Sequence, residues 1–118
     1  MHELYEQLKT IIETETDLSG TVYTSGKFTG IGWFPFNYKT TTYEQELYLI
    51  SLKEYEKTVN LYVMHWVDGE NIVGQYVDVF GKSAVGKGCI RIKKLSPERE
   101  HVVRLLVQQI ATDYNKQK

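Results

Sequence analysis

The stretch GKSAVGKG, residues 81–88, nearly matches a phosphate-binding loop, because a glycine is followed after four residues by glycine and lysine. In such a loop the backbone N–H groups and the lysine hold phosphates, and a final serine or threonine holds magnesium. Gly88 stands where that hydroxyl residue is required. A helical pattern also precedes the loop and a strand pattern follows it, which is the reverse of the P-loop order. The sequence therefore predicts a tight turn at Gly86 and Gly88 rather than a nucleoside triphosphate site.

The same part of the chain is rich in cations. Residues 82–94 carry five bases and no acid, namely Lys82, Lys87, Arg91, Lys93 and Lys94. Alternation along the predicted strand 89–93 sends Arg91 and Lys93 to the same side. Two interpretations stay open: a solvated basic loop, or a basic patch that binds an anionic ligand, a phosphorylated partner or RNA.

Acidic residues gather at the other end of the chain. Apolar residues in 3–17 recur at helical spacing and predict a helix with one buried face. The opposite face carries Glu3, Glu6, Glu13 and Asp17. The pairs Glu3–Glu6 and Glu13–Asp17 are neighbours on a helix, and carboxylate oxygens suit hard cations. The other interpretation is an ordinary solvated helix face.

Conventional catalytic and zinc motifs are not found in the sequence. His2, His65 and His101 do not have the spacing of a helical zinc site. Cys89 is flanked by cations that could lower the pKa of a thiol, but a structural role is favoured. There is no S-x-x-K or G-x-S-x-G motif.

An enzyme would therefore need residues that only the fold brings together. The chain has nine tyrosines and two tryptophans, which mainly predict an aromatic core. A small enzyme with an aromatic pocket involving Trp33, Trp66 and Tyr76 is the third functional interpretation.

The bulk properties predict one cytoplasmic domain spanning residues 1–118. The net charge of −1 argues against nucleic acid or anionic lipid as a favoured partner. No apolar run approaches the roughly 20 residues of a membrane span. The acidic, amphipathic N-terminus is unlike a secretory signal, and a single cysteine suits a reducing compartment. The oligomeric state stays open.

Periodicity predicts an α+β fold, an antiparallel sheet packed against N- and C-terminal helices with a short additional helix. Strands are expected at 21–24, 31–38, 47–55, 58–66 and 89–93, the short helix at 73–80, and the closing helix from Ser96-Pro97. Pro35 cannot donate to a ladder, so its strand is at an edge or interrupted there. Strands 47–55 and 58–66 have apolar residues on both faces in places, which predicts a well-covered sheet.

The stretch FGKSAVGKGCIRIKKLSPE, residues 80–98, resembles the signature of the YdhG-like family of small bacterial proteins. The resemblance is most specific over residues 80–110 and looser over 28–79. It implies a frataxin-like fold, and one branch of the family is described as an intracellular iron chaperone. It carries no settled catalytic motif.

On this resemblance the leading functional prediction is an iron carrier. Frataxin-like proteins are thought to hold iron weakly on carboxylates along the first helix and the adjoining strand, which here implies Glu3, Glu6, Glu13 and Asp17, with iron-receiving proteins as partners. The interaction module built on residues 81–94 is the second prediction.

Overall fold

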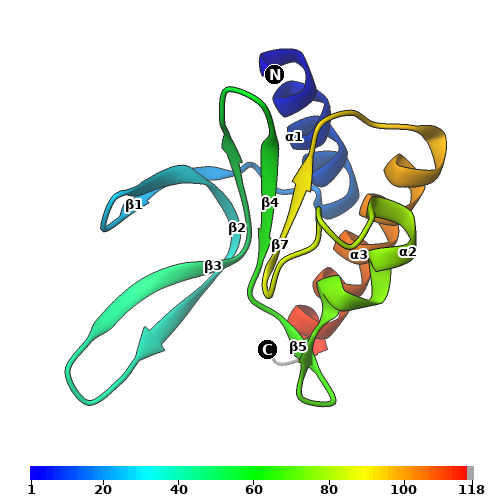
Figure 1. Cartoon of the computed structure of the whole chain (residues 1–118). Coiled ribbons are helices and arrows are strands. Elements are labelled where there is room, and N and C mark those ends of the chain that lie inside the picture. Colours follow the sequence, from blue (N-terminus) through cyan, green and yellow to red (C-terminus); the bar gives the residue numbers. More distant parts are fainter. Residues whose placement is uncertain (117–118) are drawn as a thin grey trace.

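Two terminal helices lie together on one face of a five-stranded antiparallel sheet (Figure 1). The computed structural model describes residues 1–116. The sheet has the order β1-β2-β3-β4-β7, and its strands span Thr21–Ser25, Phe28–Lys39, Glu44–Glu54, Val59–Val63 and Cys89–Ile92. The helices are α1 (His2–Thr16) and α3 (Pro97–Lys116). The predicted α+β class is therefore confirmed.

The core lies between the helices and the sheet. The apolar stripes of α1 and α3 meet the inward residues of β3, β4 and β7, and the best buried include Leu8, Ile12, Ile50, Leu61, Ile92, Leu106 and Ile110. Each such side chain stabilises the fold by about 1.5–3 kcal/mol. On the rim of the helix pair, Glu15 of α1 accepts hydrogen bonds from Arg104 (2.9 Å) and Gln108 (2.8 Å) of α3.

The pairing of β2 with β3 is interrupted at Phe34, the residue before Pro35. Phe34 has a φ of 63°, and both it and Trp33 are buried in the core. The Tyr114 ring of α3 packs on Phe34 with 4.9 Å between centroids, and its hydroxyl donates to the Pro35 carbonyl. Because β1 pairs only with residues 28–32, β2 is also an edge strand at Pro35. Beyond this point β2 and β3 continue as a hairpin that projects from the body (Figure 1).

The chain between β4 and β7 folds back over the end of the sheet. Strands β5 (Trp66–Val67) and β6 (Glu70–Asn71) form a small hairpin, followed by the 3-10 helix η1 (Ile72–Tyr76) and α2 (Val77–Phe80). The predicted helix at 73–80 is thus divided into two short elements. Loop 81–88 then leads directly into β7, so the helix-loop-strand order that argues against a P-loop is confirmed. No helix in residues 1–116 is both long and apolar enough to cross a bilayer.

Candidate ligand-binding site

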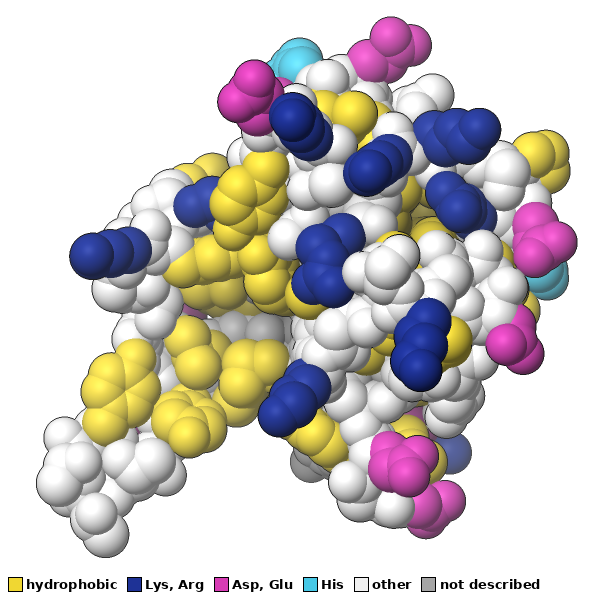
Figure 2. All heavy atoms as spheres, viewed as in Figure 1, with side chains coloured by type: hydrophobic (Ala, Val, Ile, Leu, Met, Phe, Trp, Pro, Cys, Tyr) yellow, Lys and Arg dark blue, Asp and Glu magenta, His cyan; other side chains and the backbone are white. Residues whose placement is uncertain are grey.

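The face of the sheet opposite the helices is hollowed and lined with aromatic side chains. Figure 2 shows hydrophobic side chains gathered in this hollow, between the projecting β2–β3 hairpin and the body of the molecule. We call it the aromatic groove; its volume is about 430 Å³, and its lining comes from Tyr23, Ser25, Phe28, Leu47, Tyr48, Ser51, Tyr62, Val63, Met64, Trp66, Asn71, Lys87 and Gly88. The groove is thus built from four strands of the sheet together with β5, β6 and loop 81–88.

A break in side-chain alternation places Tyr48 on the groove side. Leu49 and Ile50 both pack against the core, whereas Tyr48 and Ser51 both line the groove. The break falls where the β2–β3 ladder skips the pair Phe34–Leu49. The second apolar face that the sequence indicated is therefore not covered by another layer but forms the groove.

The groove wall is a continuous series of ring contacts. Tyr23 packs on Tyr48 with 4.6 Å between centroids and on Phe28 with 5.6 Å. Phe28 in turn meets Tyr62 edge-on at 5.2 Å. Such offset and edge contacts fix the rings against one another, so the wall is formed before any ligand arrives.

The floor of the groove carries one buried polar pair. The hydroxyls of Tyr23 and Ser51 lie 2.6 Å apart, and Ser51 is only 2% exposed. Burial raises the pKa of Tyr23 above its ordinary value of 10.0, so the phenol is neutral at physiological pH. The floor therefore presents neutral, mutually hydrogen-bonded hydroxyls.

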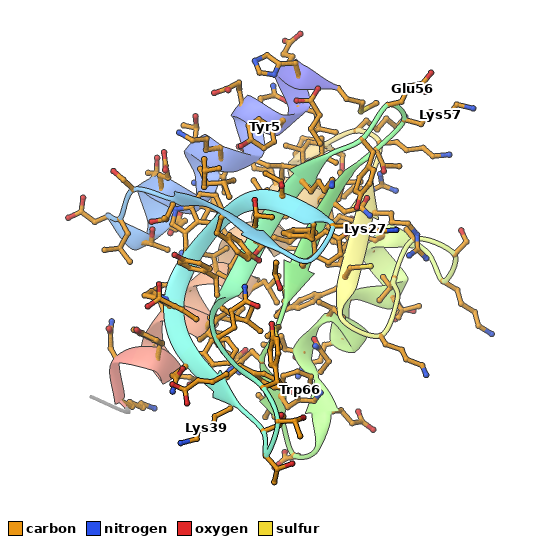
Figure 3. The ribbon with its side chains drawn as sticks, turned by 90° about the vertical axis from the view of Figure 1, so that its left-hand side faces the viewer. Tyr5, Lys27, Lys39, Glu56, Lys57 and Trp66 are labelled. Carbon is orange, nitrogen blue, oxygen red and sulfur yellow. The ribbon has the colours of Figure 1, made fainter. Side chains whose placement is uncertain are left out.

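Trp66 of β5 lines one end of the groove (Figure 3), and in Figure 1 its strand lies apart from the projecting β2–β3 hairpin. It remains 54% exposed, but the chain on either side of it is held in place. His65 Nε2 lies 2.8 Å from Asp113 Oδ2 in α3, and the side-chain amide of Asn71 donates to the Val63 carbonyl at 2.8 Å. The indole thus projects from a fixed backbone, which favours stacking on a ligand ring.

Cations predominate around the groove, although the hydroxyl of the lining residue Tyr48 donates to the Glu46 carboxylate at 3.3 Å. Lys87 is the one ionised side chain among the groove's described lining residues. Lys53 Nζ lies 5.3 Å from the Phe28 ring centroid and 5.2 Å from that of Tyr55. Lys27 occupies the β1–β2 turn next to Phe28 (Figure 3). An anionic group of a ligand would therefore be attracted to this rim, and a cation repelled.

The structure separates the five predicted anion-binding cations. Lys87 lines the aromatic groove, while Arg91 and Lys93 line a second depression together with Arg99. Lys82 and Lys94 are exposed and line neither. Figure 2 shows that Lys and Arg side chains gather over the face carrying β4 and β7, with acidic side chains at its periphery.

The four predicted iron ligands lie on α1 and at its C-terminal end, but they are not gathered around one point. Glu13 accepts hydrogen bonds from Lys9 (3.0 Å) and the Gly20 backbone (2.7 Å). Glu3 and Glu6 border a depression between α1 and the start of α3, and Asp17 is an exposed C-cap with a φ of 56°. Within residues 1–116, no three His, Cys, Asp or Glu side chains form a group that could hold a metal ion. Iron carriage stays a prediction.

Of the three residues proposed for an aromatic pocket, Trp66 alone lines the groove. Trp33 is 1% exposed in the core, and Tyr76 packs half-buried against that core. Four further lining residues were not predicted from the sequence: Tyr23, Phe28, Tyr48 and Tyr62. The available signal was Gly30 and Gly32, which alternate along β2 and leave its outer face without side chains at these two positions.

Comparison with protein-family models finds no match to this chain, and neither does comparison with curated proteins or with solved structures. The YdhG-like resemblance therefore remains a prediction.

Proposed function

We propose that this protein binds a small planar organic anion in the aromatic groove. The observation that carries the proposal is the combination of a preformed aromatic wall with Lys87 as the one ionised lining side chain described. A volume of about 430 Å³ is within the range of small-molecule sites, which are mostly apolar with a few placed polar groups.

The chemistry of the lining selects both features of the ligand. Stacked and edge-on rings favour a flat apolar body, each ring contact contributing about 0.5–1.5 kcal/mol beyond area burial. The Lys87 ammonium favours a carboxylate, sulfonate or phosphate on that body. A cationic ligand would also find an aromatic wall, but it would meet Lys87 and Lys53 without a compensating acid in the lining.

The geometry supports binding rather than turnover. The Tyr23 and Ser51 hydroxyls are hydrogen-bonded to each other. Asn71 uses its amide nitrogen on Val63 and its amide oxygen on the Val73 N–H, so both ends are already engaged. The polar lining is therefore occupied in shaping the groove.

Two ligands of the same shape test the proposal. 2-Naphthoate and its neutral analogue 2-naphthalenemethanol are titrated separately, and backbone amide shifts are followed by NMR. We expect both to shift Ser51, Tyr62 and Gly88, with the acid binding about tenfold more tightly through its charge-assisted contact. No shift in the groove with either compound at about 1 mM would contradict the proposal.

Two variants separate the contribution of ring stacking to ligand binding from that of charge. Trp66→Ala should weaken both compounds by about tenfold, because it removes a stacking surface. Lys87→Gln should abolish the preference for the acid while leaving the alcohol unchanged. Lys82→Gln is the matched control, since it removes a nearby charge that does not line the groove. Equal effects of Lys87→Gln and Lys82→Gln would show that the preference for the acid comes from the overall positive charge of this surface rather than from a contact with Lys87.

A further inference from the structure

A second concave site lies between β7, the loop after α2 and the first turn of α3. It has a volume of about 410 Å³ and is lined by Thr58, Phe80, Ser83, Ala84, Arg91, Lys93 and Arg99. We call it the basic pocket. Three of its seven lining side chains are cations and none is an acid. It shares no lining residue with the aromatic groove.

The two arginines of the basic pocket are held in place by neutral groups. Arg91 donates through Nη2 to the Ser83 carbonyl at 2.9 Å. Arg99 donates through Nη1 to the Lys94 carbonyl at 3.2 Å, and its guanidinium lies 5.5 Å from the Phe80 ring centroid. Each guanidinium has five N–H donors, so these contacts orient the groups and leave further donors for a ligand.

The positive charge of the basic pocket is not neutralised by the protein. Every ion pair found among residues 1–116 involves other cations: Lys9, Lys39 and Arg104, together with His2 and His65. Glu98 and Glu100 both flank Arg99 in sequence; Glu100 is paired with Arg104 at 3.1 Å, and Glu98 takes part in none of the ion pairs found among residues 1–116. Three like charges around one depression repel each other, and a bound anion would relieve that repulsion.

From this geometry we infer that the basic pocket binds the phosphate group of a small phosphorylated molecule. A tetrahedral dianion offers several acceptor oxygens at once, and guanidinium groups match them in pairs. Lys93 adds a third charge. Ser83 also lines the pocket. A monovalent carboxylate would use only part of this donor set.

Titration with inorganic phosphate tests the inference directly. At low ionic strength and about pH 7.5, where phosphate is mostly a dianion, we expect saturable amide shifts at Ser83, Arg91 and Arg99. Binding should weaken at about pH 5, because the monoanion carries half the charge. The same protein with 2-naphthoate reports the aromatic groove separately, so failure at one site leaves the other distinguishable.

Variants that each remove one positive charge test whether phosphate binds in the basic pocket. Arg91→Gln and Lys93→Gln should each weaken phosphate binding by about tenfold. Arg99→Gln should do the same, and its fold is checked by thermal unfolding because it also loses the Phe80 contact. Lys94→Gln is the matched control: it removes a neighbouring charge outside the pocket and should change affinity by less than about threefold.

Three outcomes would overturn the inference. One is the absence of saturable shifts up to about 10 mM phosphate. Another is an equal loss in Lys94→Gln, which would indicate a diffuse positive field. The third is binding of a uridine oligonucleotide without any saturable binding of phosphate, which would assign the cations to a polymer surface.

Discussion

The hydroxyl of Tyr23 in β1 lies 2.6 Å from the hydroxyl of Ser51 in β3, although β2 runs between these strands. Tyr23 is paired with Gly30, and Ser51 with Gly32. Neither glycine puts a side chain in the way, so the phenol crosses β2 to reach the serine. One hydrogen bond therefore joins non-adjacent strands and sets the floor of the aromatic groove.

Removing one member of this pair should be more harmful than removing both. Tyr23→Phe leaves the buried Ser51 hydroxyl without its partner, so we expect a loss of about 1–2 kcal/mol in the free energy of unfolding. Ser51→Ala combined with Tyr23→Phe should recover part of that loss. Urea unfolding of the double-mutant cycle measures the coupling.

Tyr38→Phe serves as the control for this cycle, because Tyr38 is an exposed tyrosine on the projecting hairpin. It should change stability by less than about 0.5 kcal/mol. A coupling energy indistinguishable from zero between Tyr23 and Ser51 would show that the hydrogen bond contributes nothing to the fold.

Gly32 is required because the Tyr48 ring lies directly against its backbone. A Cβ on Gly32 would overlap the Tyr48 Cβ and ring atoms, which are themselves packed on Tyr23. We expect Gly32→Ala to destabilise the protein by about 1–3 kcal/mol, as overpacking does, and to shift the NMR signals of the groove. Gly74→Ala is the control, since its Cβ meets nothing within 4 Å. Equal stability of the two variants would mean that the ring moves aside freely.

The order of the main elements could be predicted because it depends on local signals, whereas the β5–β6 hairpin was not predicted and the strand expected at 58–66 ends at Val63. Helical spacing in α1 and α3, and runs of β-branched and aromatic residues in the strands, are visible within short windows. The aromatic groove depends on two non-local features instead. The broken alternation at Phe34–Leu49 moves Tyr48 to the other face, and the crossing of Tyr23 over β2 needs the strand order.

The basic pocket could be predicted in part, because two of its cations follow a local strand pattern. Alternation along β7 placed Arg91 and Lys93 on one side, and the structure puts both in the pocket. Arg99 belongs to a different element, and it reaches the site because α3 begins beside the end of β7. Nothing in the local sequence distinguishes Lys82 and Lys94, which lie outside the basic pocket, from the cations that line it.

The iron prediction can be tested on the acidic helix itself. Ferrous iron bound there would broaden amide signals of residues 3–17 by paramagnetic relaxation. Because Glu13 already holds Lys9 and the Gly20 N–H, an ion would have to displace them, so we expect any broadening to centre on Glu3 and Glu6. Magnesium at equal concentration is the diamagnetic control. Unchanged signals at about 1 mM iron would contradict the carrier role.

The stability of the protein should fall in acid through Glu13. Burial disfavours its charge, but hydrogen bonds from the Gly20 backbone and from Lys9 outweigh this and lower the pKa of Glu13 below its ordinary value of 4.5. The folded state therefore binds this proton less readily than the unfolded state does. The stabilisation is present above about pH 4.5 and is lost as the pH falls through the folded pKa.

Glu13→Gln removes this charge while keeping the shape of the side chain. It should lower the free energy of unfolding by about 1 kcal/mol at neutral pH, and the difference from the wild type should be smaller at about pH 3. Glu56→Gln, at the exposed β3–β4 turn (Figure 3), is the control and should change stability by less than about 0.5 kcal/mol. Urea unfolding at both pH values measures the difference. If Glu13→Gln were equally destabilising at the two values, its effect would come from packing rather than from the ionised carboxylate.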